Sequence, residues 1–321
     1  MTQAHGAIRG RYIFLASNAY SGSTLLSFLL GAHPEIGTVS DVSGRRRERA
    51  MDRFSCSCGR LMTACPFWER LLAELGGSGL AFSLADFALG FDDRRPRWLG
   101  ALRVRTMGNE RLERLRDAAF RLAPGDDHWM RSIGERTAVF ADAVLRVTGA
   151  SVFVDASKER LRARYLQRYV DPELRVIHLV RDPRGVVEST IRRGRLNISA
   201  AEVARRWART NAAIVRSMSR IPRAQRMVVR YEDLCADPQA VMRRLFAFSS
   251  VDPSVDVTNL VAGEQHLLGN SMRLGTVDAI RLDERWRAVI SEDDLSTIIA
   301  VAGPLHDALS AATRHALDGQ A

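Results

Sequence analysis

Residues 17–26 read S-N-A-Y-S-G-S-T-L-L and lie between an apolar run at 12–16 and a leucine-rich segment that ends at 30. An apolar run, a small polar turn and a second apolar segment predict a strand, a tight turn and the start of a helix. Backbone N–H groups in the first turn of a helix have no partner within that helix, so such a turn favours phosphate or sulfate. The stretch therefore predicts an anion-binding loop at the first strand–helix connection.

The residues of this loop are small or carry hydroxyl groups. Those expected to hold the anion are Ser21, Gly22, Ser23, Thr24 and Leu25. Gly22 lets the backbone approach an anion, and the three hydroxyl groups add donors. An ATP- or GTP-binding loop, G-x-x-x-x-G-K-[ST], would place glycine at 17 and lysine at 23, and both positions hold serine here. A P-loop-type kinase or other nucleotide-binding protein is therefore the less favoured alternative.

Further strand and helix patterns alternate along the chain. Strands are expected at 11–16, 36–39, 151–154, 174–180 and 227–231, and helices at 23–32, 158–169, 185–193, 200–218 and 238–248. This alternation predicts an α/β fold with a parallel sheet covered on both faces. Residues 45–150 lack strand patterns and are interrupted at 76–79 and 124–127. We interpret them as a helical insertion that binds the acceptor, within a single domain that spans 1–321.

The composition limits the classes of partner. Lysine and arginine number 47 against 37 acidic residues, which gives a net charge of +10. Such a charge suits nucleic acid, a membrane surface or an anionic small molecule. Aromatic residues make up 7% of the chain and are scattered, so a basic nucleic-acid-binding module is disfavoured. Apolar runs stay well below the roughly 20 residues of a membrane span, and a signal-peptide pattern is missing, so we expect a cytoplasmic protein without a transmembrane segment.

A second anion-binding motif follows the strand expected at 174–180. Residues 181–189 read R-D-P-R-G-V-V-E-S. With a helix beginning near Gly185, Ser189 lies in its early turns and meets the same anion as Arg181, and Arg193 follows one turn later. Two such loops on one parallel sheet predict a ligand that carries two separated anionic groups.

The two motifs together resemble the sulfotransferases that use 3′-phosphoadenosine 5′-phosphosulfate, in particular bacterial members similar to the tyrosylprotein and carbohydrate sulfotransferases. The resemblance implies a P-loop-like parallel sheet. It also implies that the first loop holds the 5′-phosphosulfate and that Arg181, Ser189 and Arg193 hold the 3′-phosphate.

Two later stretches extend the resemblance. V-R-Y-E-D-L at 229–234 is similar to a nucleotide-side stretch of the family, and G-N-S-M-R at 269–273 looks like its C-terminal phosphate-contacting loop. The resemblance thereby adds Tyr231, Asn270 and Arg273 to the expected nucleotide contacts. It adds Ser271 to the expected catalytic groups.

The resemblance also implies the reaction. A sulfuryl group passes from the phosphosulfate to a hydroxyl or amine of a small-molecule, lipid or carbohydrate acceptor by in-line displacement, without a metal and with 3′-phosphoadenosine 5′-phosphate as product. Such transfer needs a base for the acceptor proton and donors for the developing charge. Asp41 stands where related sulfotransferases carry a glutamate and is the expected base, the alternative being a helix cap near Ser43. His33 and Glu35 are next in line as the base.

One position departs from the family pattern. The residue before S-G-[ST]-T is usually lysine or arginine, and here it is Tyr20. Lys158 is the sole lysine of the chain, and it follows the strand expected at 151–154. Related tyrosylprotein sulfotransferases place a catalytic lysine after a comparable strand. Lys158 is therefore expected to supply the missing charge, the alternative being a surface lysine that opens a helix.

Three of the four cysteines, Cys56, Cys58 and Cys65, fall within ten residues. The stretch C-x-C-G…C-P-F-W at 56–68 resembles bacterial members of the group. Three cysteines are three potential zinc ligands, but the spacing offers no clear fourth ligand, so a structural role without metal is favoured. His178 lies in the middle of an expected strand and is interpreted as a core residue.

Overall fold

The computed structural model describes residues 8–42, 54–91, 96–193, 198–257, 265–269, 271–274 and 280–318. Within these ranges five parallel strands form one sheet in the order β2-β3-β1-β4-β5. The strands are β1 (Arg11–Ser17), β2 (Ile36–Ser40), β3 (Val152–Asp155), β4 (Arg175–Val180) and β5 (Arg226–Arg230). The expected strands and the α/β class are confirmed.

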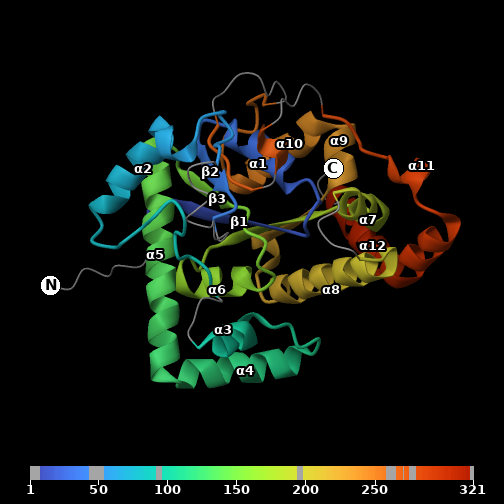
Figure 1. Cartoon of the computed structure of the whole chain (residues 1–321), viewed down its shortest axis with the longest axis horizontal. Coiled ribbons are helices and arrows are strands. Elements are labelled where there is room, and N and C mark those ends of the chain that lie inside the picture. The colour runs from blue at the N-terminus through green and yellow to red at the C-terminus, as the bar shows by residue number, and fades with distance from the viewer. Residues whose placement is uncertain are drawn as a thin grey trace.

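Helices cover both faces of this sheet (Figure 1). The α-helices are α1 (Ser23–Gly31), α2 (Pro66–Gly76), α3 (Arg97–Val104), α4 (Glu110–Leu122), α5 (Pro124–Thr148), α6 (Arg162–Tyr169), α7 (Pro183–Arg192), α8 (Ala200–Met218), α9 (Tyr231–Ala236), α10 (Pro238–Ser249), α11 (Trp286–Val289) and α12 (Glu292–Asp318). Short 3-10 turns occupy η2 (Met62–Ala64), η3 (Arg223–Gln225) and η5 (Ser271–Leu274).

The two faces of the sheet bury different sets of side chains because successive residues of a strand point to opposite sides. Ile13 and Leu15 of β1 pack with Leu26 of α1 and Phe246 of α10. Phe14 lies in the core on the other face, which includes side chains of α2, α5, α6 and α8. Figure 1 shows α1 and α10 on one side of the sheet, with α6 and α8 on the other. Because all five strands run parallel, their carboxyl ends lie along one edge of the sheet, between the two cores.

Between 54 and 148 the described elements are η2, α2, α3, α4 and α5, as the sequence predicts for a helical insertion, with a short antiparallel bridge between Ser55 and Leu61; residues 43–53 and 92–95 lie outside the described ranges. The predicted break at 76–79 is confirmed, because α2 ends at Gly76. The predicted break at 124–127 is confirmed but lies slightly earlier, at the extended Ala123 between α4 and α5, and α5 begins at Pro124 with Asp126 and Asp127 in its first turn. Proline at the first helical position and acidic residues near the helix N-terminus favour a helix start.

The long helix α12 was not anticipated from the sequence. It contacts α8, α7 and β5, and its Ala302 and Leu309 join Trp207 of α8 in a small core. Within the described residues, the stretch Glu292–Thr313 is long and apolar enough to cross a membrane by length and composition alone. Of the apolar window in this stretch, 22% is buried, and Ala302 and Leu309 are among the buried residues of the stretch.

Candidate active site

The loop after β1 turns sharply because two of its residues adopt left-handed backbone conformations. Tyr20 has a φ of 64° and Gly22 a φ of 89°. A Cβ atom on residue 22 would lie 2.3 Å from Cδ2 of Tyr231, so glycine serves both the turn and the close approach of that ring. The Leu26 N–H donates to the Gly22 carbonyl at 3.0 Å, and the N–H groups before it precede the helical ladder of α1. This geometry is typical of an anion-binding loop.

The hydroxyl groups of the loop are buried. Ser21, Ser23 and Thr24 are each at most 4% exposed, and Leu25 packs into the core beneath them. The buried Oγ atoms of Ser17 and Ser21 have no hydrogen-bond partner within the described part of the chain. Because an unsatisfied buried hydroxyl is costly, an anion that accepts from Ser21 would stabilise this arrangement.

The loop after β4 places the positively charged Arg181 beside the loop after β1. Arg181 Nη1 donates to the Tyr20 carbonyl at 3.0 Å and to Ser189 Oγ at 3.3 Å. The guanidinium of Arg193 lies 5.4 Å from the centre of the Tyr20 ring. The structure therefore brings together Arg181, Ser189 and Arg193, the three residues that the sequence predicts at one phosphate, and it places them next to the first loop.

The neighbouring charges of this second loop are paired internally. Asp182 caps α7 by accepting from the Arg184 N–H, and its carboxylate also accepts from the Arg184 guanidinium at 2.5 Å. Burial opposes ionisation of Asp182, but the Arg184 hydrogen bonds outweigh it and lower the pKa of the carboxyl group. Arg184 is thus neutralised by its own loop, whereas the carboxylate beside Arg181, that of Asp283, lies 3.6 Å from Arg181 Nη2, and the hydrogen bonds of Arg181 go to neutral oxygens.

Tyr231 and Glu232, in the stretch at 229–234, contact both the loop after β1 and the loop after β4. The Tyr231 ring packs against Gly22 and lies 4.8 Å below the Arg181 guanidinium. Glu232 Oε1 accepts from the Asp182 N–H at 2.8 Å, and burial raises the pKa of Glu232. Tyr231 therefore holds the first loop against Arg181 of the second, and its predicted nucleotide contact stays a prediction.

Asp41 and Lys158 meet at the carboxyl ends of β2 and β3. Lys158 Nζ lies 3.7 Å from Asp41 Oδ2, and their side chains are 28% and 22% exposed. Ser40 has a φ of 67° at an irregularity in the pairing of β2 and β3. The Ser40 carbonyl accepts from the Ala156 N–H at 2.9 Å, and the Val42 N–H donates to Ser157 Oγ at 3.2 Å. These bonds fix the two strand ends that carry the ion pair.

Lys158 lies outside a helix. The helix predicted at 158–169 begins only at Arg162, so the alternative in which Lys158 opens a helix is wrong. Asp155 explains the extended start, because it accepts from the Ser157 N–H at 2.8 Å and from Arg162 Nε at 2.8 Å. The loop at 156–161 is thus tied at both ends, with Lys158 between them.

The remaining candidate bases lie elsewhere. His33 is buried against Phe246, and its Nδ1 accepts from the Glu35 N–H at 3.1 Å. His33 and Glu35 precede β2, at the amino end of the sheet, opposite Asp41. His178 is fully buried with Nε2 2.9 Å from Asn211 Oδ1, and burial lowers its pKa to about 4, which agrees with a core role. These positions exclude His33 and Glu35 from the edge that carries both loops.

The predicted C-terminal contacts are placed in part. Asn270, Ser43 and the Ser271 side chain lie outside the described residues. Arg273 is buried and donates to the carbonyls of Gly269 and Ser55, at 3.3 and 2.6 Å. These bonds hold the Arg273 guanidinium beside Ser55, and its predicted phosphate contact stays a prediction.

A cavity of about 490 Å³ lies between α4 and α6, lined by several arginines. Its wall includes Tyr169, which precedes β4, and Arg220, which precedes β5. Both residues belong to the amino end of the sheet. This basic cavity is therefore separate from the edge that carries the anion-binding loops.

The fold and the two loops define an α/β protein built to hold a ligand with anionic groups at the carboxyl edge of a parallel sheet. A sequence model of the sulfotransferase family matches residues 90–254, just over half of the chain. The chain belongs to the sulfotransferase family. It is therefore a transferase, and the kinase and nucleic-acid-binding alternatives are not favoured.

Solved structures of sulfotransferases are similar to the chain at low identity. The sulfotransferase domain of the Synechococcus PCC 7002 olefin synthase is 19% identical over 93% of this chain and 97% of that one, with a TM-score of 0.48. The sulfotransferase domain of the curacin biosynthetic pathway is 17% identical over 91% of this chain and 97% of that one, with a TM-score of 0.48. Sulfotransferase STF1 of Mycobacterium tuberculosis H37Rv is 17% identical over 80% of this chain and 72% of that one, with a TM-score of 0.45. No curated protein matches the chain.

Proposed function

We propose that the enzyme takes its sulfuryl group from 3′-phosphoadenosine 5′-phosphosulfate. The 5′-phosphosulfate would lie on the N–H groups and hydroxyls of Ser21, Ser23 and Thr24, and the 3′-phosphate between Arg181, Ser189 and Arg193. The observation that carries this proposal is the contact of Arg181 with both Tyr20 and Ser189, because it joins the two anion-binding loops at one side chain. A nucleotide with phosphates at both ends of its ribose matches two adjacent loops.

Two guanidinium groups support the position of Tyr20. Arg181 donates to the Tyr20 carbonyl, and Arg193 lies over the Tyr20 ring. In related sulfotransferases a basic residue stands at this position, and here the charge comes from α7 and the loop before it. Tyr20 thus orders the two cations, and Lys158 brings a third from the opposite side of the loop.

We assign the chemistry to the Asp41–Lys158 pair. An acceptor oxygen or nitrogen forms a bond to sulfur while the bond from sulfur to the bridging phosphate oxygen breaks. The acceptor proton passes to the Asp41 carboxylate, and the electron pair of the broken bond leaves with 3′-phosphoadenosine 5′-phosphate. The Lys158 ammonium offsets the charge that develops on the bridging oxygen. Their partial exposure leaves both groups accessible to substrates.

The acceptor is proposed by class only. A small molecule, lipid or carbohydrate with a hydroxyl or amine would enter beside Asp41. The hairpin at 54–61, which belongs to the insertion expected at 45–150, lies next to this edge, since the Arg273 guanidinium bonds Ser55 and lies 4.6 Å from the Phe54 ring. We propose that this insertion selects the acceptor within a single domain, and that the enzyme acts in the cytoplasm.

Calorimetric titration tests the donor assignment. Arg181→Ala is expected to weaken binding of 3′-phosphoadenosine 5′-phosphate by ~1.5–3 kcal/mol, because it removes a charge-assisted phosphate contact. Binding of adenosine 5′-phosphate, which lacks the 3′-phosphate, should change far less. Arg205→Ala, an exposed arginine of α8, controls for the loss of one positive charge. Equal losses for both nucleotides would overturn the assignment of the 3′-phosphate.

A further inference from the structure

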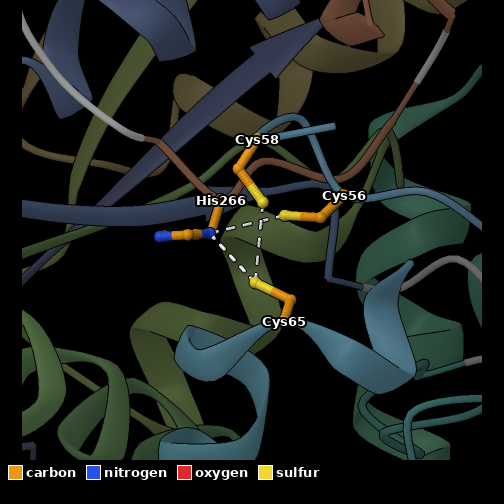
Figure 2. Close-up of side chains that lie close together, drawn as sticks. All are labelled: Cys56, Cys58, Cys65 and His266. Carbon is orange, nitrogen blue, oxygen red and sulfur yellow. Dashed lines mark hydrogen bonds between the residues drawn. The ribbon is translucent and has the colours of Figure 1, made fainter. Parts of the chain in front are cut away.

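We propose that Cys56, Cys58, Cys65 and His266 bind a structural zinc ion. Figure 2 shows the three sulfur atoms and the imidazole converging on a common centre. The ligand atoms all lie within 4.8 Å of one another. His266 is the fourth ligand that the cysteine spacing does not reveal, because it follows Cys65 by 201 residues.

The distances fit a single tetrahedral ion. Zinc bonds of about 2.3 Å to sulfur and about 2.0–2.1 Å to nitrogen imply edges of about 3.8 Å between sulfurs and about 3.6 Å from sulfur to nitrogen. Cys58 Sγ lies 3.7 Å from Cys65 Sγ. His266 Nδ1 lies 3.5 Å from Cys56 Sγ and 3.3 Å from Cys65 Sγ. These three edges are within a few tenths of an ångström of those of a zinc tetrahedron, and all six edges lie within 4.8 Å.

A short hairpin presents the first two ligands. Ser55 and Leu61 form an antiparallel bridge, and the Cys56 N–H donates to the Arg60 carbonyl at 2.8 Å. The chain reverses at Gly59, which has a φ of 85° and donates its N–H to the Cys56 carbonyl at 3.0 Å. This tight turn directs the Cys56 and Cys58 side chains toward one centre (Figure 2).

Helix α2 presents the third ligand. Cys65 is the residue before Pro66 and caps α2, which extends for 11 residues. A helix N-terminus favours negative charge, so this position suits a thiolate. The indole Nε1 of Trp68 in the same helix donates to Cys56 Sγ at 3.3 Å. Outer hydrogen bonds of this kind orient metal ligands and stabilise their ionised form.

The hairpin also clamps the segment that carries His266. Ser57, between the two cysteines, donates its hydroxyl to the Gln265 carbonyl at 2.5 Å and accepts from the Leu267 N–H at 2.6 Å. The His266 ring stacks on Phe67 with centroids 4.5 Å apart and an angle of 5°. The imidazole is thus held with Nδ1 toward the sulfurs.

Two other uses of the cysteines fit less well. A disulfide needs sulfurs about 2.05 Å apart, whereas Cys58 and Cys65 are separated by 3.7 Å and all cysteines are free. An iron–sulfur cluster holds its ligands around several iron atoms, and the ligand atoms here are too close together for that. Tetrahedral sites rich in sulfur and nitrogen are typical of zinc, and four protein ligands indicate a structural rather than a catalytic ion.

The negative charge of the zinc complex has a positive side chain beside it. Zinc binds three cysteines as thiolates and histidine as the neutral imidazole, and the three thiol protons pass to solvent, which leaves one net negative charge. Arg273 lies beside the site, since its guanidinium donates to the carbonyl of Ser55, the residue before Cys56. A positive side chain next to an anionic complex is favourable, so Arg273 would stabilise the thiolate-bound ion.

The ion would join two distant parts of the chain. The segment after His266 is anchored to the sheet, because the Leu268 N–H donates to the Val39 carbonyl at 2.8 Å. A Cβ atom on Gly269 would lie 4.0 Å from both Thr24 Oγ1 and Ser40 Oγ. Zinc at this site therefore fastens the hairpin of the insertion to the segment that borders the anion-binding loop.

Metal analysis of the full chain tests the proposal. Protein expressed with zinc and dialysed without chelator is expected to carry one zinc ion per chain by elemental analysis. Replacement by cobalt should give the visible absorption bands of a tetrahedral ion and a near-ultraviolet sulfur-to-metal charge-transfer band. Cys58→Ser, at the partly exposed ligand, should lose most of the metal and lower the melting temperature. Cys235→Ser, at the cysteine outside the cluster, should retain it.

The same measurements can overturn the proposal. Protein that carries substoichiometric zinc, with three or more thiols that react at once with a thiol reagent under native conditions, would exclude the site. A brown protein that contains iron, or an intact mass two hydrogens lighter, would replace zinc by a cluster or a disulfide. The Arg181→Ala variant should keep its zinc, so the outcome is independent of the nucleotide assignment.

Discussion

Two ion pairs lie a few residues apart at the carboxyl end of β3, and they differ in burial, in distance and in the role that we expect for each. Arg162 and Asp155 are fully buried and joined at 2.8 Å. Lys158 and Asp41 are about one quarter exposed and lie 3.7 Å apart. Asp155 is saturated with partners, since it also accepts from the Tyr12 hydroxyl at 2.8 Å and from the Ser157 N–H.

The difference follows from solvent access. A buried carboxylate must be fully hydrogen-bonded to offset its desolvation, so Asp155 is held in one position by its donors. An exposed pair at a longer distance contributes little to stability, because water screens it. The buried pair therefore holds the loop at 156–161, and the exposed pair can exchange its partner for a substrate.

The largest expected effect is on stability. Asp155→Asn should lower the free energy of unfolding by ~3–5 kcal/mol, because it removes the buried carboxylate that pairs with Arg162 and leaves that buried guanidinium with the longer 3.4 Å contact to the Glu159 carboxylate. Asp41→Asn should change it by only ~0–1 kcal/mol. Urea denaturation of both variants measures the two values. If both variants lost a similar free energy of unfolding, the proposed difference between the buried and the exposed pair would be wrong.

The next effect is on turnover. Lys158→Met should lower kcat by ~10²–10³-fold, because it removes a donor aimed at charge that develops in the transition state. Affinity for 3′-phosphoadenosine 5′-phosphate should stay near that of the parent. Lys158→Arg should restore activity only in part, since a planar guanidinium does not reproduce a compact ammonium.

The control for Lys158 lies in the same loop. Arg160→Met removes an exposed cation two residues away and should leave turnover unchanged. If Lys158→Met transfers sulfuryl groups at the parental rate, the charge at this edge must come from Arg181 and Arg193 alone.

Asp41 gives a smaller but sharper test. Asp41→Asn keeps the shape of the side chain and removes its basicity, so kcat should fall by ~10²-fold with little change in donor affinity. Glu35→Gln, at the opposite end of β2, is the matched control and should be silent. Single-turnover rates with the sulfuryl donor and a model phenol or sugar measure both. Near-parental rates in Asp41→Asn would remove it as the base.

The local motifs could be predicted from the sequence because their chemistry is local. The turn at 17–26 and the run R-D-P-R after β4 offer an anion backbone N–H groups and side chains that lie within one turn of a helix. Strand and helix patterns likewise depend on neighbours along the chain, and β1 to β5 appear where the periodicity predicts them. The misplaced elements are the start of α6 and the break at 124–127. Buried Asp155 determines the first, and an N-terminal proline determines the second.

What the sequence determined by itself is therefore the α/β class, both anion-binding loops and the candidates Asp41 and Lys158. Only the tertiary structure decided which of them meet. The order β2-β3-β1-β4-β5 brings Asp41 to Lys158 and sets Arg181 against Tyr20, and it also brings His266 to three cysteines more than 200 residues earlier. A periodic pattern reports which face of an element is apolar, whereas the neighbour of that face is fixed by long-range packing, which leaves no trace at short separations in the chain.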